Sequence, residues 1–172
     1  MRYIQENLDA RVARARTTLG KGCRYKMGGG TNLATTEWPW RQTEMTSDCS
    51  NWLCWVVGMA KHQGAFDNKP WSGNPRYDWI GTDTMFFDAT GPHEIFVEIP
   101  QIVAGCMLVF PPAHGRAGHC GLVAKVVNNR PIVIDCRSPM PGDEAIGESV
   151  LRFDVFRRHK AVPFVLVQDV KP

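Results

Sequence analysis

The sequence has no apolar run long enough to cross a bilayer, because its longest apolar stretches, such as residues 102–112, are shorter than the roughly 18 to 20 residues that a spanning helix needs. It also has little excess charge: 20 Lys and Arg against 17 Asp and Glu leave +3, which argues against a nucleic-acid-binding protein. No internal repeat, low-complexity tract or linker divides the chain. We therefore expect a single domain over residues 1–172, and a monomer.

The N-terminal region lacks the features of a secretory signal, because residues 1–20 mix charges into a helical pattern and have no apolar segment or small-residue cleavage site. The sequence thus predicts synthesis in the cytoplasm without a signal peptide. Six cysteines occur without a CxxC pair, and a chain of this length can build a core without disulfides. Free thiols, mostly buried, are the prediction, with three disulfides as the alternative for a secreted chain.

Hydrophobic spacing predicts helices first and strands second. Apolar residues three to four apart predict an amphipathic helix over residues 3–19, and Ser47-Asp48 precedes a second helix, apolar on most sides, over residues 49–60. The intervening residues 22–46 are predicted as an irregular loop, and residues 63–92 as turns and short helices. Runs rich in Val, Ile and Leu predict strands of a meandering antiparallel sheet at residues 106–110, 119–127, 131–136, 150–156 and 163–167. This order is typical of the α+β class.

Cys49 is the cysteine whose position favours reactivity. It falls in the predicted first turn of the second helix, where unpaired backbone N–H groups and the positive end of the helix dipole stabilise a thiolate. The same N–H groups could receive the negative oxygen of a tetrahedral intermediate. The alternative is that Cys49 is only a buried apolar side chain of this helix.

A thiol nucleophile needs a base, and His119 is the histidine best placed to serve. It begins a predicted strand, and a Cys followed far downstream by a His is the nucleophile and base order of cysteine hydrolases. Asp135 interrupts the apolar run of the next strand, where a carboxylate is costly unless it is paired, so it can orient the imidazole. The alternatives are a structural histidine at a strand start and an aspartate bonded to a turn amide.

These residues stand in strings that resemble the NlpC/P60 (papain-like) cell-wall peptidases. The resemblance covers residues 13–136 in the right order. Its motifs are Leu19-Gly20, Tyr25-Lys26-Met27-Gly28-Gly29, Ser47-Asp48-Cys49-Ser50, residues 102–110, Gly118-His119-Cys120-Gly121-Leu122-Val123 and Pro131-Ile132-Val133-Ile134-Asp135. The chain departs from the family pattern where Asn51 replaces a glycine, Cys106 replaces an aspartate, and Asp135 stands where histidine is commonest.

The resemblance implies a papain-like α+β fold, with N-terminal helices and the catalytic helix packed on a central antiparallel sheet. It implies hydrolysis of amide bonds in peptidoglycan stem peptides through a Cys49 thioester, with His119 as base and then acid and Asp135 orienting His119. No metal and no organic cofactor is implied. By position, Tyr25 would lie beside the oxyanion and substrate carbonyl. Asp48 and Ser50 would help to recognise a free stem-peptide amine.

Other readings stay open at this point. Within enzymes, the related CHAP-type amidases use the same Cys and His strategy on other wall bonds. A catalytically inactive domain that binds cell walls is the alternative from another class. A zinc site built from His114 and His119 with Cys49 or Cys136 is a third, although loop histidines beside a strand cysteine are a poor metal signature.

A wall hydrolase without a signal peptide needs another route to the wall. A phage lysin would be released in a holin-dependent way, whereas a bacterial toxin would be delivered by a secretion apparatus and countered by an immunity protein. The compact single-domain build is compatible with either route, and of the two we favour the phage lysin.

Overall fold

The computed structural model describes residues 1–31, 35–40, 43–61, 80–138 and 144–171. The helices are α1 (Gln5–Thr17), α2 (Cys49–Val56), α3 (Thr82–Thr90) and α4 (Val150–Arg158), followed by the short 3-10 helix η2 (Val167–Asp169). The strands are β1 (Arg24–Tyr25), β2 (Thr46–Ser47), β3 (Phe96–Glu98), β4 (Met107–Phe110), β5 (His119–Val127), β6 (Arg130–Cys136), β7 (Ile146–Ser149) and β8 (Val162–Leu166). The predicted α+β class is confirmed.

A six-stranded sheet forms the centre, in the order β3-β8-β4-β5-β6-β7, and every neighbouring pair is antiparallel. The run β4-β5-β6 forms the first three strands of the predicted meander, and β7, which was not predicted, pairs next to β6. The last predicted strand, β8, does not continue the meander but returns to pair with β4. The tight turn between β5 and β6 is made by Asn128 and Asn129, which have φ values of 50° and 59°. Two positive φ values at Asn residues are what a two-residue hairpin turn requires.

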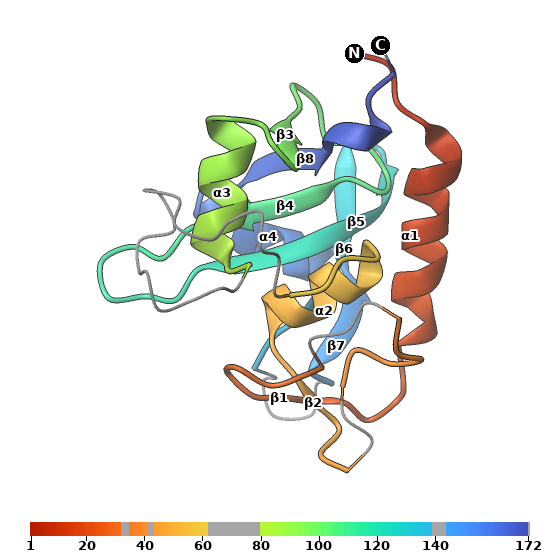
Figure 1. The fold of residues 1–172 in the computed structure, drawn as a ribbon, viewed down its shortest axis with the longest axis vertical. Coiled ribbons are helices and arrows are strands. Elements are labelled where there is room, and N and C mark those ends of the chain that lie inside the picture. The colour runs from red at the N-terminus through yellow and green to blue at the C-terminus, as the bar shows by residue number, and fades with distance from the viewer. Residues whose placement is uncertain (32–34, 41–42, 62–79, 139–143, 172) are drawn as a thin grey trace.

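Helices cover both faces of this sheet (Figure 1). In the figure α2 lies in front of the sheet and α4 behind it, with α1 along one side. Strand β4 shows the consequence for side chains, because Met107 and Val109 pack with α2 and α3, whereas Leu108 and Phe110 pack with Phe156 of α4. A strand buried on both faces reads as a continuous apolar run, as residues 107–110 do.

The segment 150–156, predicted as a strand, is helical instead. Ser149 caps α4 by accepting a hydrogen bond from the Arg152 backbone N–H at 3.3 Å. The buried residues of α4 are Arg152 and Phe156, four positions apart, which is the spacing of one helix face. The apolar residues of this segment therefore do not form the buried face of a strand, and the prediction of a strand is wrong.

The second helix is shorter than predicted. It ends at Val56 rather than near residue 60, and Gly58 follows with φ of 76°. In this conformation the Gly58 and Met59 N–H groups donate to carbonyls of the last turn, at Trp55 and Cys54. A glycine in the left-handed region after a helix is a common terminator.

The region predicted as turns and short helices is described only in part. Residues 62–79 lie outside the described residues, and α3 accounts for residues 82–90. Strands β1, β2, β3 and β7 were not predicted. None of the helices in the described part of the chain is long and apolar enough to span a membrane.

The glycine before β4 tests how closely α1 packs against the sheet. Gly105 has φ of 82°, and a Cβ there would lie 2.7 Å from the Leu8 carbonyl oxygen of α1. Gly115 has a similar φ of 74° but open space around it. We expect Gly105→Ala to lower the free energy of unfolding by about 3 kcal/mol, and Gly115→Ala by about 1 kcal/mol, in urea titrations. Equal losses of stability in the two variants would show that α1 can move away from the added methyl group at no cost in free energy.

Candidate active site

The start of α2 is fixed by the carboxylate of Asp48, its N-cap residue. Asp48 Oδ1 accepts hydrogen bonds from the Asn51 backbone N–H at 2.7 Å and from the Ser50 hydroxyl at 3.0 Å. Asp48 Oδ2 accepts from the Gly28 N–H at 2.9 Å and from Lys61 Nζ at 2.7 Å. An aspartate cap of this kind orients the first turn of a helix and satisfies its N–H groups. Cys49 is therefore held in a defined place.

Asn51, which departs from the resembled family, has a structural task. Its side-chain amide donates to the Pro39 carbonyl at 2.6 Å and to the Ser47 hydroxyl at 3.1 Å. A Cβ on Gly30 would overlap this amide, so the loop passes directly over it. Asn51 thus attaches the long loop between β1 and β2 to the helix that carries Cys49.

The imidazole of His119 lies at the beginning of β5, held from two sides. Its Nε2 is 2.8 Å from Asp135 Oδ2, and its ring stacks on Phe156 of α4 with centroids 5.2 Å apart. Asp135 is fully buried on β6, where it pairs in register with Gly121 of β5. With Nε2 bound to the carboxylate, the other ring nitrogen is left for the thiol, and Cys49 and His119 are close enough for each to shift the pKa of the other.

The electrostatics favour a thiolate and an imidazolium. For Cys49, a hydrogen bond from the Cys120 thiol lowers the pKa most; burial opposes it, and the hydrogen bond and positive charge of His119 lower it further, to about 5. Burial by itself lowers the pKa of His119, but hydrogen bonds to Asp135 and Cys49 outweigh it and raise the pKa to about 9. Between these values the ion pair is the stable form, which is how a cysteine becomes nucleophilic at neutral pH.

The remaining thiols differ from Cys49. All six cysteines are free and buried. Burial raises the pKa of Cys54 and Cys106 to about 12. The predicted burial of the thiols is confirmed, and Cys49 is the thiol that combines a strongly lowered pKa with a place in a cleft.

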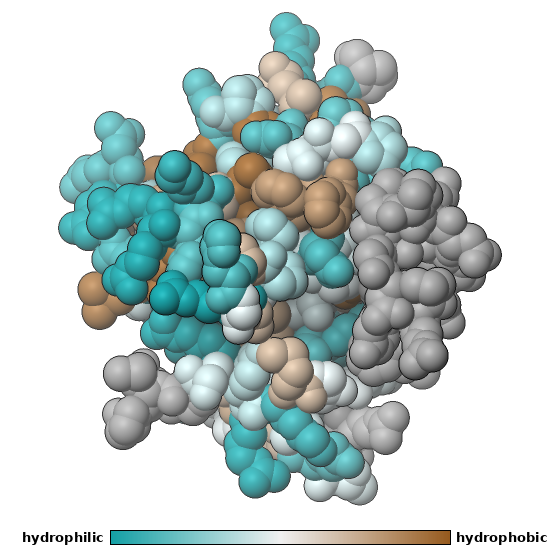
Figure 2. Space-filling model, turned by 90° about the vertical axis from the view of Figure 1, so that its left-hand side faces the viewer, coloured by the Kyte–Doolittle hydropathy of each residue, from teal (hydrophilic) through white to brown (hydrophobic). Residues whose placement is uncertain are grey.

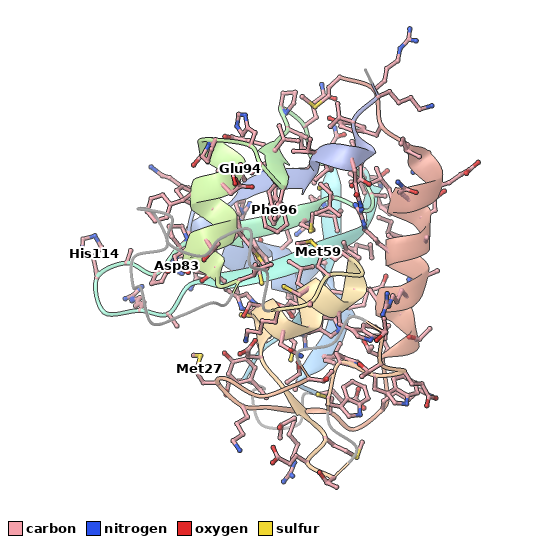
Figure 3. The ribbon with its side chains drawn as sticks, in the orientation of Figure 1. Met27, Met59, Asp83, Glu94, Phe96 and His114 are labelled. Carbon is pink, nitrogen blue, oxygen red and sulfur yellow. The ribbon has the colours of Figure 1, made fainter. Side chains whose placement is uncertain are left out.

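That cleft has a volume of about 410 Å³. Its walls come from the end of β1 and the loop after it, the start of α2, Lys61, the start of α3 and the loop before β5. The lining residues are Tyr25, Met27, Gly28, Asp48, Cys49, Ser50, Lys61, Gly81, Thr82, Asp83, Thr84, Pro112, Ala117 and Gly118. Met27 and Asp83 lie on the same side of the molecule in Figure 3. Figure 2 looks onto that side, where the surface is mostly polar with scattered apolar residues.

Four of the six predicted site residues line this cleft, and the other two, His119 and Asp135, bind each other and are linked to Cys49 through His119. The four lining residues are Tyr25, Asp48, Cys49 and Ser50. Burial raises the pKa of Tyr25, and the nearby Cys49 and Asp48 raise it further, so its hydroxyl stays protonated and able to donate. The Asp48 carboxylate, expected to bind a substrate amine, already accepts from the helix, the loop and Lys61.

Sequence reasoning missed three residues of the site. Lys61 forms a buried ion pair with Asp48, Cys120 contacts the Cys49 thiol, and Arg152 forms a buried ion pair with Asp135. Of these three residues, only Arg152 could have been found from the sequence. If residues 150–158 are taken as a helix, Arg152 lies four positions before Phe156 and so shares its buried face. In the described part of the chain, no three His, Cys, Asp or Glu side chains gather in a way that could hold a metal ion.

Comparisons of this chain with protein-family models, with curated proteins and with solved structures found no match. The likeness to NlpC/P60 peptidases therefore stays a prediction from the sequence motifs.

The ion pair can be tested without a substrate. We expect iodoacetamide to alkylate Cys49 with a pH midpoint near 5, since the thiolate is the reactive form, and His119→Gln to move that midpoint toward the ordinary thiol value of about 8.5. Mass spectrometry of the peptide containing Cys49 separates it from the other thiols. A wild-type midpoint near 8.5 would contradict the assignment.

Proposed function

We propose that this chain is a cysteine hydrolase that cleaves amide bonds in peptidoglycan stem peptides. The observation that carries the proposal is the contact of a helix-terminal thiol with a histidine whose far nitrogen binds a buried carboxylate, beside an open cleft. Thiol, imidazole and carboxylate in this order are the parts of a nucleophilic acyl-transfer site. The wall-peptide substrate is supported by the sequence motifs around Tyr25, Cys49 and His119.

The reaction follows from the parts. The Cys49 thiolate attacks the amide carbonyl carbon and forms a tetrahedral intermediate, whose negative oxygen is received at the start of α2. Collapse of the intermediate expels the amine, which takes its proton from the His119 imidazolium, and leaves a Cys49 thioester. The neutral imidazole then removes a proton from water, which attacks the thioester, and the carboxylic acid leaves as the Cys49 thiolate is restored.

The cleft offers groups that a peptide backbone can bind. Its lining offers hydroxyl groups on Tyr25, Ser50, Thr82 and Thr84, and three glycines where backbone can approach closely. At Gly118 a Cβ would lie 2.7 Å from the Phe110 carbonyl oxygen and would overlap the Thr82 hydroxyl, so the close packing of this wall requires a glycine. Hydroxyl and backbone groups are the partners that peptide amides use for hydrogen bonds.

Release of new amino groups from purified peptidoglycan tests the proposal. We expect Cys49→Ala to lose about 1000-fold or more of the wild-type rate, because it removes the nucleophile, and a chelator to leave the wild-type rate unchanged. Cys54→Ala is the matched control, since it removes a buried thiol from the same helix outside the cleft and should keep the activity.

The products and the binding behaviour separate the competing functions. Mass spectrometry of released fragments would show cleavage within the stem peptide, whereas a CHAP-type amidase would separate glycan from peptide or cut a cross-bridge. A protein that sediments with cell walls and releases no amino groups from several wall types would be a binding module, and the hydrolase proposal would then be wrong.

A further inference from the structure

Arg152 is a buried arginine in direct contact with the candidate triad. It lies on α4, behind the sheet in Figure 1, with a side chain only 5% exposed. Its Nη1 donates to Asp135 Oδ1 and, at 2.9 Å, to the Asp135 carbonyl oxygen. Its Nη2 donates to the Glu144 carbonyl at 3.0 Å. Because Oδ1 is bound to the guanidinium, Oδ2 is the oxygen that faces His119.

Two glycines make this contact possible. A Cβ on Gly147 of β7 would overlap the Arg152 guanidinium. On β5, a Cβ on Gly121 would lie 2.9 Å from Phe156 Cζ and 3.1 Å from the Asp135 Cβ. The strands on both sides of Asp135 therefore lack side chains where α4 packs most closely, and the ion pair is enclosed by the fold.

The charges at the triad balance only when Arg152 is included. In the reactive form Cys49 and Asp135 are negative and His119 is positive, which leaves one negative charge without a counter-ion. Interactions between charges are strong in a buried site, where little water screens them. Without Arg152 the site would relieve the excess charge by binding a proton at the Cys49 thiolate.

Other titratable groups near the triad have partners of their own or stay neutral. Asp48 pairs with Lys61 at 2.7 Å, and Glu148 of β7 pairs with Arg16 of α1 at 2.8 Å. His159, after α4, stacks on Phe110. Four further groups have raised pKa values and therefore stay uncharged at neutral pH: Tyr25, Cys54, Cys120 and Cys136. The Cys23 thiol contacts Cys136, and its pKa is lowered chiefly by that hydrogen bond.

We propose that Arg152 is a positioning residue of the candidate triad: it turns one Asp135 oxygen toward His119 and supplies the positive charge that lets Cys49 remain a thiolate. This inference rests on the proposed thiol chemistry but not on the identity of the substrate. It assigns a role in reactivity to a residue of the helix on the far side of the sheet.

The test is the pH profile of Cys49 alkylation by iodoacetamide in the full chain, read by mass spectrometry of the Cys49 peptide. Arg152→Gln keeps hydrogen-bond donors but loses the charge, so we expect its midpoint to rise by about one pH unit or more. Arg152→Lys keeps the charge but loses the forked geometry, so we expect a rise of about half a unit. The Lys variant decides the question if the Gln variant does not fold.

Arg11→Met is the matched control. Arg11 is also a buried arginine paired with a buried aspartate, Asp169, but at the contact of α1 with η2. We expect this variant to lose thermal stability, as Arg152→Gln does, and to keep the wild-type alkylation midpoint. Folded Arg152 variants with the wild-type midpoint would overturn the proposal, as would an equal shift in Arg11→Met.

The two proposals fail in different ways. Alkylation needs no wall substrate, so the expected shifts in a protein that cleaves no peptidoglycan would leave the role of Arg152 standing and remove the proposed substrate. Cleavage of peptidoglycan by wild type, together with unshifted midpoints in the folded Arg152 variants, would support the proposed function and overturn the role of Arg152.

Discussion

The Asp48 carboxylate is the point on which the rest of the site depends. It joins the first turn of α2, the loop after β1 at Gly28, and Lys61 beyond the end of α2, all within hydrogen-bonding distance. Loss of one partner of such a buried cluster leaves the others unsatisfied, which costs far more than a surface bond. The positions of Cys49 and of the loop after β1, which both line the cleft, depend on this one side chain.

The second constraint is charge balance in a buried place. Two carboxylates, Asp48 and Asp135, flank the thiol, and each has a cation of its own in Lys61 and Arg152. A carboxylate without a counter-ion would compete with the thiolate for positive charge. The two ion pairs come from opposite sides of the sheet, so the helices on both faces contribute to the electrostatics of a single sulfur atom.

Much of this arrangement could be predicted from the sequence, for local reasons. Helix α1, the hairpin at Asn128-Asn129 and the cap at Asp48 follow from periodicity and turn chemistry that neighbouring residues determine. The pairing of Asp135 with a partner followed from the cost of burying a carboxylate in an apolar strand. These inferences needed no knowledge of distant residues.

The parts that sequence reasoning missed depend on contacts between distant segments. The run 150–156 alternates like a strand, and the Ser149 cap together with the packing of Arg152 and Phe156 against the sheet favours the helix. The residues next to Lys61 and Cys120 in the sequence give no sign of their roles. These roles arise because the fold brings Lys61 to Asp48 and Cys120 to Cys49. The short strands β1, β2, β3 and β7 carry too few residues to show a period.

The candidate reacting groups and the walls of the cleft come from different parts of the fold. Its reacting groups come from α2, β5 and β6, whereas much of its wall comes from the loop after β1, the first turn of α3 and the loop before β5. These wall segments can change in length and composition while the sheet and its hydrogen bonds stay as they are. Under the proposed function, exchange of these loops alone is expected to change the substrate while the thiol, imidazole and carboxylate stay in place.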